Sequence, residues 1–269
     1  MAHFSFLSLS SASFLCLGLG CAQAADPARA PYAHDGDWKI IVSPYVWATS
    51  LNGNASLAGF DGHVDLPFSD VLKHLDFAFM GNIEATNGTF GVYFDGQYAR
   101  TSQEEEIFAN SVGLGTRVTS LGAGMYYRIY EKQLGGNTAF GDPQRFGIEP
   151  TIGVRWTRLE AGVEALGLTE PRQADWTDPF VGVRANLDLG EHWNLFGEVD
   201  VGGFGVGSKL SVNAQAYLGY RTFVFDHPAI LRVGYRALSQ DYETDDFTGN
   251  KFRWDVVQHG PVVGMSLVF

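Results

Sequence analysis

The sequence predicts an all-β protein: a transmembrane antiparallel up-and-down β-barrel of about ten strands, with twelve possible and a short helix in the first long loop. Segments of about 10 to 15 residues alternate between apolar and polar side chains, as strands with one lipid-facing side do. No stretch after the first 25 residues is apolar for the roughly 18 positions that a spanning helix needs. A chain that crosses a bilayer without helices must close into a barrel, because every backbone polar group needs a partner in lipid.

The third observation is the end of the chain, Phe252–Phe269. Counting back from Phe269, alternate positions are apolar, and the positions between them are mostly small or apolar. This pattern is typical of a barrel strand with one face on lipid and the other on the lumen. The alternative is that the segment is the last strand of a soluble β-sandwich. The terminal Phe269 resembles the C-terminal signature of bacterial outer-membrane barrels. That resemblance implies that Phe269 is an assembly signal read by the barrel assembly machinery.

The composition limits the partners. The 269 residues include 33 glycines, 14% aromatic and 18% charged residues, with a net charge of −12. This negative charge argues against nucleic acid as a partner. No cluster of His and carboxylate side chains has metal-ligand spacing, so we expect neither a metal nor a cofactor. The expected partners are outer-membrane lipids and the assembly machinery, and the sequence does not identify an extracellular ligand.

The first 24 residues predict a signal peptide. An apolar core is followed by Ala22-Gln23-Ala24, which indicates cleavage before Ala25, although no Lys or Arg precedes the core, so the true start can differ. Cys16 and Cys21 both lie in this segment, so the mature chain would have no cysteine. A lipoprotein acylated on Cys21 is the alternative, with Gly18 where a lipobox has Leu. We expect a periplasmic lead-in at 25–36 and the barrel at 37–269.

The alternation is clearest in Thr89–Thr101 and Phe146–Trp156, where apolar residues recur at every second position. The same pattern predicts the following strands: Lys39–Ser50, Phe77–Thr86, Thr89–Thr101, Thr116–Tyr130, Arg145–Arg158, Thr177–Leu189, Trp193–Val206, Ser211–Phe225, Ala229–Tyr242 and Phe252–Phe269.

The connections between these strands alternate in length, with short turns on the periplasmic side and long loops outside. The short turns are Asn87-Gly88, Gly190-Glu191 and Asp226-His227-Pro228, with a longer one at Thr138–Gln144. The long loops are Ser102–Gly115, Ala161–Trp176 and Glu243–Lys251.

The first external segment, Leu51–Asp76, combines two features. Asp61-Gly62 lies between two short alternating arms, which indicates a hairpin. Pro67–Leu75 predicts one or two turns of helix with Ser69 as a possible cap. If the two arms span the membrane, the barrel has twelve strands.

Most charged residues within the predicted strands share the phase of the lumen. They form a predicted lumen charge network: Glu84, Asp95, Arg128, Glu149, Arg155, Asp178, Arg184, Glu198, Asp200, Arg221, Arg232 and Arg236, with Asp188 in the same phase. Arginine and carboxylate groups of nearly equal number can satisfy one another inside a small barrel. We therefore favour a salt-bridged, largely filled lumen over a charge-selective pore.

Aromatic residues in the outward phase gather near the turn side and predict an interface girdle. They are Phe90, Tyr127, Phe146, Trp193 and Phe269.

Several fragments resemble a family of proteobacterial outer-membrane β-barrel proteins that has no assigned biochemical role. They are Ser43-Pro44-Tyr45-Val46-Trp47, Pro67-Phe68-Ser69-Asp70, Gly202–Ser208, Gly234-Tyr235-Arg236 and Gly260-Pro261. The resemblance implies fold and compartment, the outer membrane, and gives no catalytic residue. Gly202–Ser208 also looks like a phosphate-binding loop, but it lacks the Lys-Ser/Thr ending and a following helix. We expect a bend or bulge there.

The sequence does not predict an enzyme. His63, His74 and His259 are the histidines outside the signal, the lead-in and the periplasmic side. By phase His259 points at lipid or the upper interface. His63 and His74 lie in the first external segment, where a histidine is far more often solvated than a general base. The favoured interpretation is a structural or surface-interaction barrel, the alternative is a narrow pore or passive transporter, and an outer-membrane enzyme ranks below both.

Overall fold

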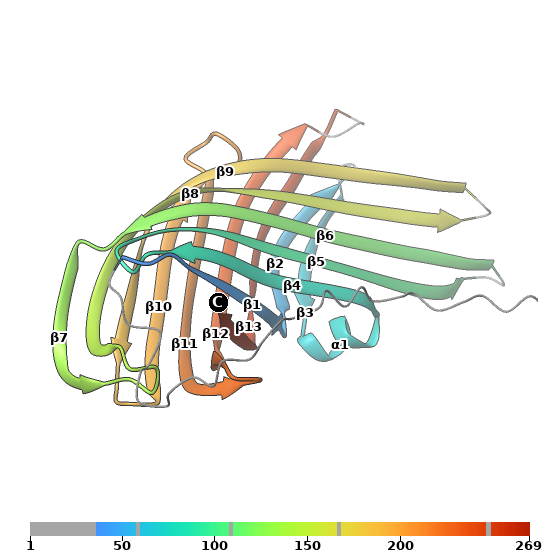
Figure 1. Ribbon diagram of the computed structural model, residues 1–269. Coiled ribbons are helices and arrows are strands. Elements are labelled where there is room, and N and C mark those ends of the chain that lie inside the picture. Colours follow the sequence, from blue (N-terminus) through green and yellow to red (C-terminus); the bar gives the residue numbers. More distant parts are fainter. Residues whose placement is uncertain (1–35, 58–59, 108–109, 166–167, 246–248) are drawn as a thin grey trace, which may run out of the picture. The chain divides into compact units, whose positions relative to one another are not determined.

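The computed structural model describes residues 36–57, 60–107, 110–165, 168–245 and 249–269. The predicted signal peptide and all but the last residue of the lead-in lie outside this part. Ten antiparallel strands form a closed ring in the order β1-β4-β5-β6-β8-β9-β10-β11-β12-β13, and β1 pairs with β13 to close it (Figure 1). The strands are β1 Lys39–Trp47, β4 Leu75–Thr86, β5 Phe90–Ile107, β6 Asn110–Tyr127, β8 Pro143–Ala165, β9 Leu168–Asp188, β10 Trp193–Gly202, β11 Leu210–Val224, β12 His227–Asp245 and β13 Lys251–Val268. The predicted barrel is confirmed.

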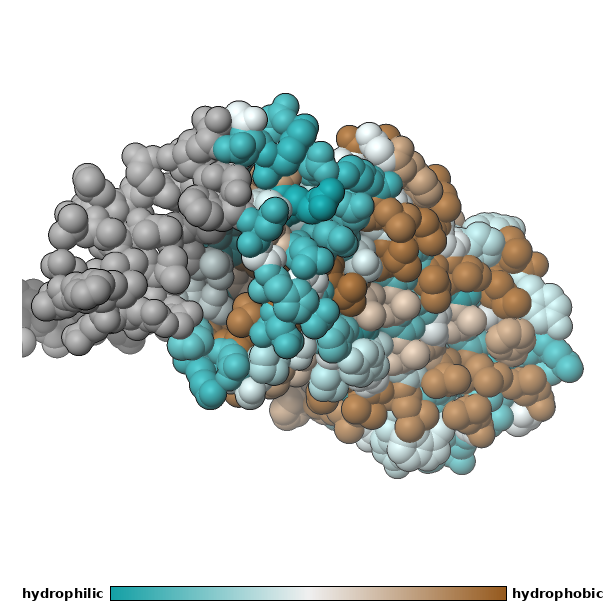
Figure 2. Space-filling model, turned by 180° about the vertical axis from the view of Figure 1, so that it is seen from behind, coloured by the Kyte–Doolittle hydropathy of each residue, from teal (hydrophilic) through white to brown (hydrophobic). Residues whose placement is uncertain are grey.

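The outer wall carries a belt of large apolar side chains. It includes Ile40, Phe79, Ile83, Phe94, Met125, Ile152, Val183, Leu195, Leu218, Leu231, Val233 and Val263, all exposed. Figure 2 shows hydrophobic residues gathered over one part of the outer face, next to a hydrophilic part. So much exposed apolar area suits lipid rather than water. A closed antiparallel barrel with such a belt is the architecture of an outer-membrane protein, and this protein lies in the outer membrane.

Four neighbouring strands are much longer than a bilayer requires. β5 and β6 have 18 residues each, β8 has 23 and β9 has 21, whereas about 9 to 11 span a membrane. Much of the predicted loops Ser102–Gly115 and Ala161–Trp176 is therefore strand, and that part of the prediction was wrong. The sequence of these segments lacks the regular apolar alternation by which the other strands were predicted.

The first external segment forms a hairpin and a helix. β2 (Ser50–Leu57) pairs with β13 above β1, and β3 (Phe60–Leu66) pairs with β2. Because the ring closes through β1 and β13, these arms add no spanning strands. Gly62 lies within β3 opposite Ala55, so the predicted turn at Asp61-Gly62 was wrong.

Helix α1 (Phe68–Lys73) lies within the predicted helix, but Ser69 does not cap it. The N-cap residue is Pro67, and the side-chain oxygen of Ser50 accepts the Phe68 N–H at 2.9 Å. A cap from another segment therefore replaces the local one that the sequence predicted.

On the periplasmic side the structure adds a strand that the sequence did not predict. The predicted strand Thr116–Tyr130 ends at Tyr127, and β7 (Tyr130–Asn137) then pairs with the lower end of β8. All eight β7 residues are exposed. A strand with water on both faces shows no apolar alternation, which explains why it was missed.

Two other turns differ slightly from prediction. β10 ends at Gly202 rather than Val206, and a turn follows with positive φ at Gly203 (86°) and Phe204 (50°), where a bend was expected. Phe225 and Asp226 have φ of 50° and 63°, so the last short turn lies one residue before the predicted Asp226-His227-Pro228.

Candidate functional site in the barrel lumen

The strand alternation sends every member of the predicted charge network into the lumen, where the surrounding inward positions are often glycine. Gly153 is an example, because a Cβ there would lie 2.5 Å from the ring of Phe180. Small residues at such positions leave room for larger side chains, here Phe180 of the neighbouring strand β9. Residues far apart in sequence are thereby brought together across the lumen.

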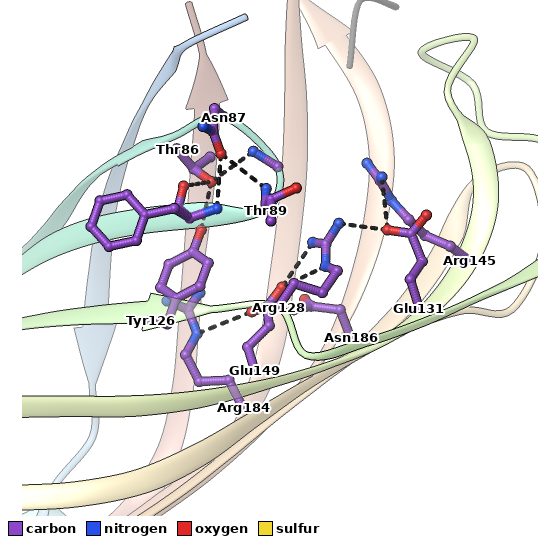
Figure 3. Close-up of polar contacts among 12 residues, drawn as sticks. Thr86, Asn87, Thr89, Tyr126, Arg128, Glu131, Arg145, Glu149, Arg184 and Asn186 are labelled. Carbon is purple, nitrogen blue, oxygen red and sulfur yellow. Dashed lines mark hydrogen bonds and ion pairs between the residues drawn. The ribbon is translucent and has the colours of Figure 1, made fainter. Parts of the chain in front are cut away.

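Arg184 of β9 is the centre of the first cluster (Figure 3). Its Nη2 lies 3.0 Å from Glu84 Oε2, and its Nε lies 3.8 Å from Glu149 Oε2. The Tyr126 hydroxyl donates to Glu84 at 2.6 Å, and the Arg184 guanidinium lies 4.0 Å from the centre of the Tyr126 ring. Arg184 is 7% exposed and Glu149 1% exposed. Buried charges of this kind are tolerated because each carboxylate receives several donors.

The cluster continues toward the periplasm through Arg128. Arg128 donates to Glu149 through Nε at 3.1 Å and through Nη2 at 2.8 Å, and it contacts Glu131 at 2.9 Å. Arg145 lies 3.4 Å from the same Glu131, and Asn186 donates to Glu149 at 3.2 Å. Figure 3 shows this chain of contacts leading from Arg184 toward the β7 end.

A second cluster lies higher in the lumen and links β8, β10, β11 and β12. Arg155 Nη2 lies 3.0 Å from both carboxylate oxygens of Asp200. Asn213 donates to Asp200 at 2.7 Å and accepts from Arg236 Nε at 3.0 Å. Arg236 in turn lies 3.3 Å from Asp95. With Asp95 of β5, the arrangement couples five strands through one continuous polar chain.

Tyr45 also donates to Asp95, at 2.9 Å. Sequence reasoning named only the charged residues and so missed Tyr45, Tyr126 and Asn213. All three share the inward phase of the charges, and that phase was the available signal.

Four predicted members behave differently. Arg221 pairs with Asp188. Asp178 accepts the indole N–H of Trp176 at 3.2 Å and the Ser208 backbone N–H at 2.6 Å, so it supports the turn after β10 rather than an arginine. Glu198 accepts from Gln215 at 2.8 Å. Arg232 makes no hydrogen bond or ion pair within the described residues, and its guanidinium lies 5.7 Å from the centre of the Phe196 ring.

A cavity of about 320 Å³ occupies the lower lumen. Lys39, Asn87 and Asp142 line its periplasmic end, and Arg155, Asn213 and Arg236 are among its uppermost lining residues. Trp47, 3% exposed, lies against Arg236 at this level. Above it the lumen is tightly packed: Leu238 is 2% exposed, and Gln240 and Val256 are 1% exposed each. We refer to this cavity as the vestibule.

The turn after β7 crosses the periplasmic mouth of this vestibule. Phe140 packs edge-on against Phe223 of β11, with ring centres 5.6 Å apart, and the Ala139 N–H donates to Glu191 O at 2.9 Å. Asp142 lies 3.7 Å from Lys39 of β1. Because these contacts reach strands on several sides of the ring, the turn narrows the mouth.

The aromatic residues of the predicted girdle lie at the periplasmic end. Tyr127, Trp193 and Phe269 are exposed, whereas Phe90 and Phe146 are partly covered by ring contacts with Trp38 and Tyr130. Phe269 and Ile40 also exchange two backbone hydrogen bonds, of 2.9 and 3.0 Å, at the seam between the first and last strands.

Two of the histidines considered in the sequence lie outside the lumen clusters. His259 points outward and contacts the Tyr235 hydroxyl at 2.7 Å, and His63 contacts Asn54 at 3.3 Å. No group of three or more His, Cys, Asp or Glu residues in the described part could hold a metal ion. Among the same residues, no helix has the length and apolar character needed to cross a bilayer.

No protein-family model matches the chain, and no curated protein matches it. Among solved structures, the chain is similar to Ail, the attachment invasion locus protein of Yersinia pestis, in complex with the heparin analogue sucrose octasulfate. The sequence identity is 13%, the match covers 86% of this chain and 98% of that chain, and the TM-score is 0.37. A Pseudomonas aeruginosa FadL homologue shows 7% identity, coverage of 86% and 90%, and a TM-score of 0.29. The Pseudomonas putida toluene transporter TodX shows 11% identity, coverage of 89% and 91%, and a TM-score of 0.18. These similarities concern the fold and extend to no ligand or partner.

Proposed function

We propose that this protein is a non-conducting outer-membrane barrel that acts through its external surface. The observation that carries the proposal is the packed upper lumen. Trp47, Leu238 and Val262 form a buried apolar cluster with Tyr45, Met80 and Tyr217 against it. Ion movement through this level would require that cluster to open, and small barrels are commonly filled in this way.

The external surface supports the second half of the proposal. β5, β6, β8 and β9 are long strands. They carry ion pairs on their outer faces, such as Arg117 with Glu160. The pairs there include Asp76 with Arg100 at 3.4 Å and Arg158 with Asp175 at 3.8 Å. We call the outer parts of β5, β6, β8 and β9 the external platform. Its side chains can contact a molecule or a cell outside the membrane.

Single-channel recording in planar bilayers tests this function. We expect no stable, step-like conductance from the wild type, because the upper lumen is packed. Arg184→Ala should also stay closed, since that change lies below the apolar cluster, and Arg117→Ala on the outer face provides a matched control. Reproducible wild-type channels whose ion selectivity changes in Arg184→Ala at unchanged stability would instead establish a narrow pore.

A further inference from the structure

Arg232 differs from the other arginines of the predicted network. Arg128, Arg155, Arg184, Arg221 and Arg236 each lie within 4.0 Å of a carboxylate. Arg232 has no such partner in the described part of the chain, and its Nε is buried without a hydrogen bond. The rest of the side chain is partly exposed and lines the vestibule. A guanidinium without an acceptor in such a place is available to bind an anion.

The charged groups near Arg232 are engaged with other partners. Those that act on it most strongly are Glu84, Arg184 and Arg221, together with the Tyr217 hydroxyl. Glu84 is already held by Arg184 and by the Tyr126 hydroxyl. Arg221 is held by Asp188. Among the described residues, Glu198 also has no arginine in contact, and it accepts from Gln215 at 2.8 Å. Arg232 therefore has no carboxylate of its own in contact.

A second unpartnered polar group lies at the same height. Asn194 of β10 is opposite Gly219 of β11, which is opposite Arg232 of β12. Asn194 is 6% exposed, and its Oδ1 has no hydrogen-bond partner. Both side chains line the vestibule, whose lining extends to the periplasmic end. A charged donor and a neutral amide at one level can recognise a carboxylate and an adjacent hydrogen-bonding group.

We infer that Arg232 and Asn194 form a binding site for a small organic carboxylate with a hydroxyl next to the carboxylate, entering from the periplasm. The Arg232 guanidinium would bind the carboxylate, and the Asn194 side-chain amide would hydrogen-bond the hydroxyl. Phe196, whose ring lies near the guanidinium, supplies an apolar side to the site. Binding at this site does not require the upper lumen to open, so it is compatible with a non-conducting barrel.

Calorimetric titration of the detergent-folded protein with glycolate, acetate, phosphate and chloride tests the site. We expect glycolate to bind best. Arg232→Met, which keeps the apolar stem, should weaken glycolate binding by about 10- to 100-fold, as expected when a charge-assisted hydrogen bond is lost. Asn194→Ala should reduce the preference for glycolate over acetate while leaving acetate binding nearly unchanged. Arg117→Met, on the outer face, should bind like the wild type.

Stability gives an independent readout of the same site. Without ligand, Arg232→Met should be at least as stable as the wild type, because it removes an uncompensated charge. Glycolate should raise the unfolding temperature of the wild type and not of Arg232→Met. If Arg232→Met does not fold, Arg232→Lys replaces it in both measurements. We expect Arg232→Lys to bind glycolate more weakly than the wild type, because lysine lacks the forked geometry of the guanidinium. Equal binding of glycolate by the wild type and the Arg232 variant, or tighter binding of phosphate or chloride than glycolate, would overturn the inference.

Discussion

The lumen and the external platform contain the same kind of ion pair in different surroundings. Arg184 and Glu84 lie 3.0 Å apart inside the barrel, with side chains 8% and 15% exposed. Arg117 and Glu160 pair on the platform, with side chains 40% and 23% exposed. Desolvation makes the loss of one lumen partner costly, whereas water can replace a partner on the platform. The comparison teaches that burial, rather than the number of ion pairs, decides how much each contributes to stability.

The largest effect should come from Arg184→Ala. The substitution leaves Glu84 without its arginine and weakens the support of Glu149, so we expect a loss of about 3 to 5 kcal/mol in the free energy of unfolding. Denaturant titration in detergent, followed by the heat-dependent shift in gel mobility, would measure it. A loss as small as that of an exposed pair would mean that the lumen is effectively solvated.

Deleting Phe269 should reduce the amount of folded protein in the membrane. The deletion removes the two backbone hydrogen bonds to Ile40 at the barrel seam, and it removes the residue that resembles an assembly signal. Phe225→Ala is the matched control, because Phe225 is an exposed aromatic at the same end and outside the seam. Phe269→Ala separates the ring from the backbone contacts. Undiminished assembly after the deletion would contradict the assigned role of the terminal residue.

Arg117→Ala should change stability by only about 0 to 1 kcal/mol, as exposed pairs do. The same unfolding titration applies, and added salt should reduce the difference further because exposed pairs are screened. A loss comparable to that of Arg184→Ala would show that the platform pair is buried in solution, for instance by a bound partner.

The smallest effect concerns Glu243, above the apolar belt. A hydrogen bond from Lys209, followed by its charge, lowers the pKa of Glu243 below its ordinary value. Its stabilising contribution is therefore present above the pKa of the unfolded chain and is lost as the pH falls through the lower pKa of the folded state. Glu243→Gln should melt slightly below the wild type near neutral pH and together with it in acid. A difference that persists in acid would exclude this origin.

The sequence was most informative where one face of a strand meets lipid. Alternation in β8 and β10 set the inward phase of Glu149, Arg155, Glu198 and Asp200, because a one-residue error would place charges in the membrane. Alternation is absent from β7, whose residues are all exposed, so that strand was not predicted. The outer halves of β5 and β9 were predicted as loops for want of the same pattern. Phase also does not determine partners across a lumen. Asp178 holds a turn and Arg232 has no carboxylate, and only three-dimensional packing could reveal either.

Two parallel double-mutant cycles would test the central claim most directly, one on Arg184 and Glu84 and the other on Arg117 and Glu160. Each cycle uses the two single alanine variants and the double variant, with unfolding free energies measured under identical conditions. We expect a coupling energy of about 2 to 3 kcal/mol in the lumen and about 0 to 1 kcal/mol on the platform. Equal coupling energies in the two cycles would contradict the account, because the same pair would then contribute equally inside and outside the barrel.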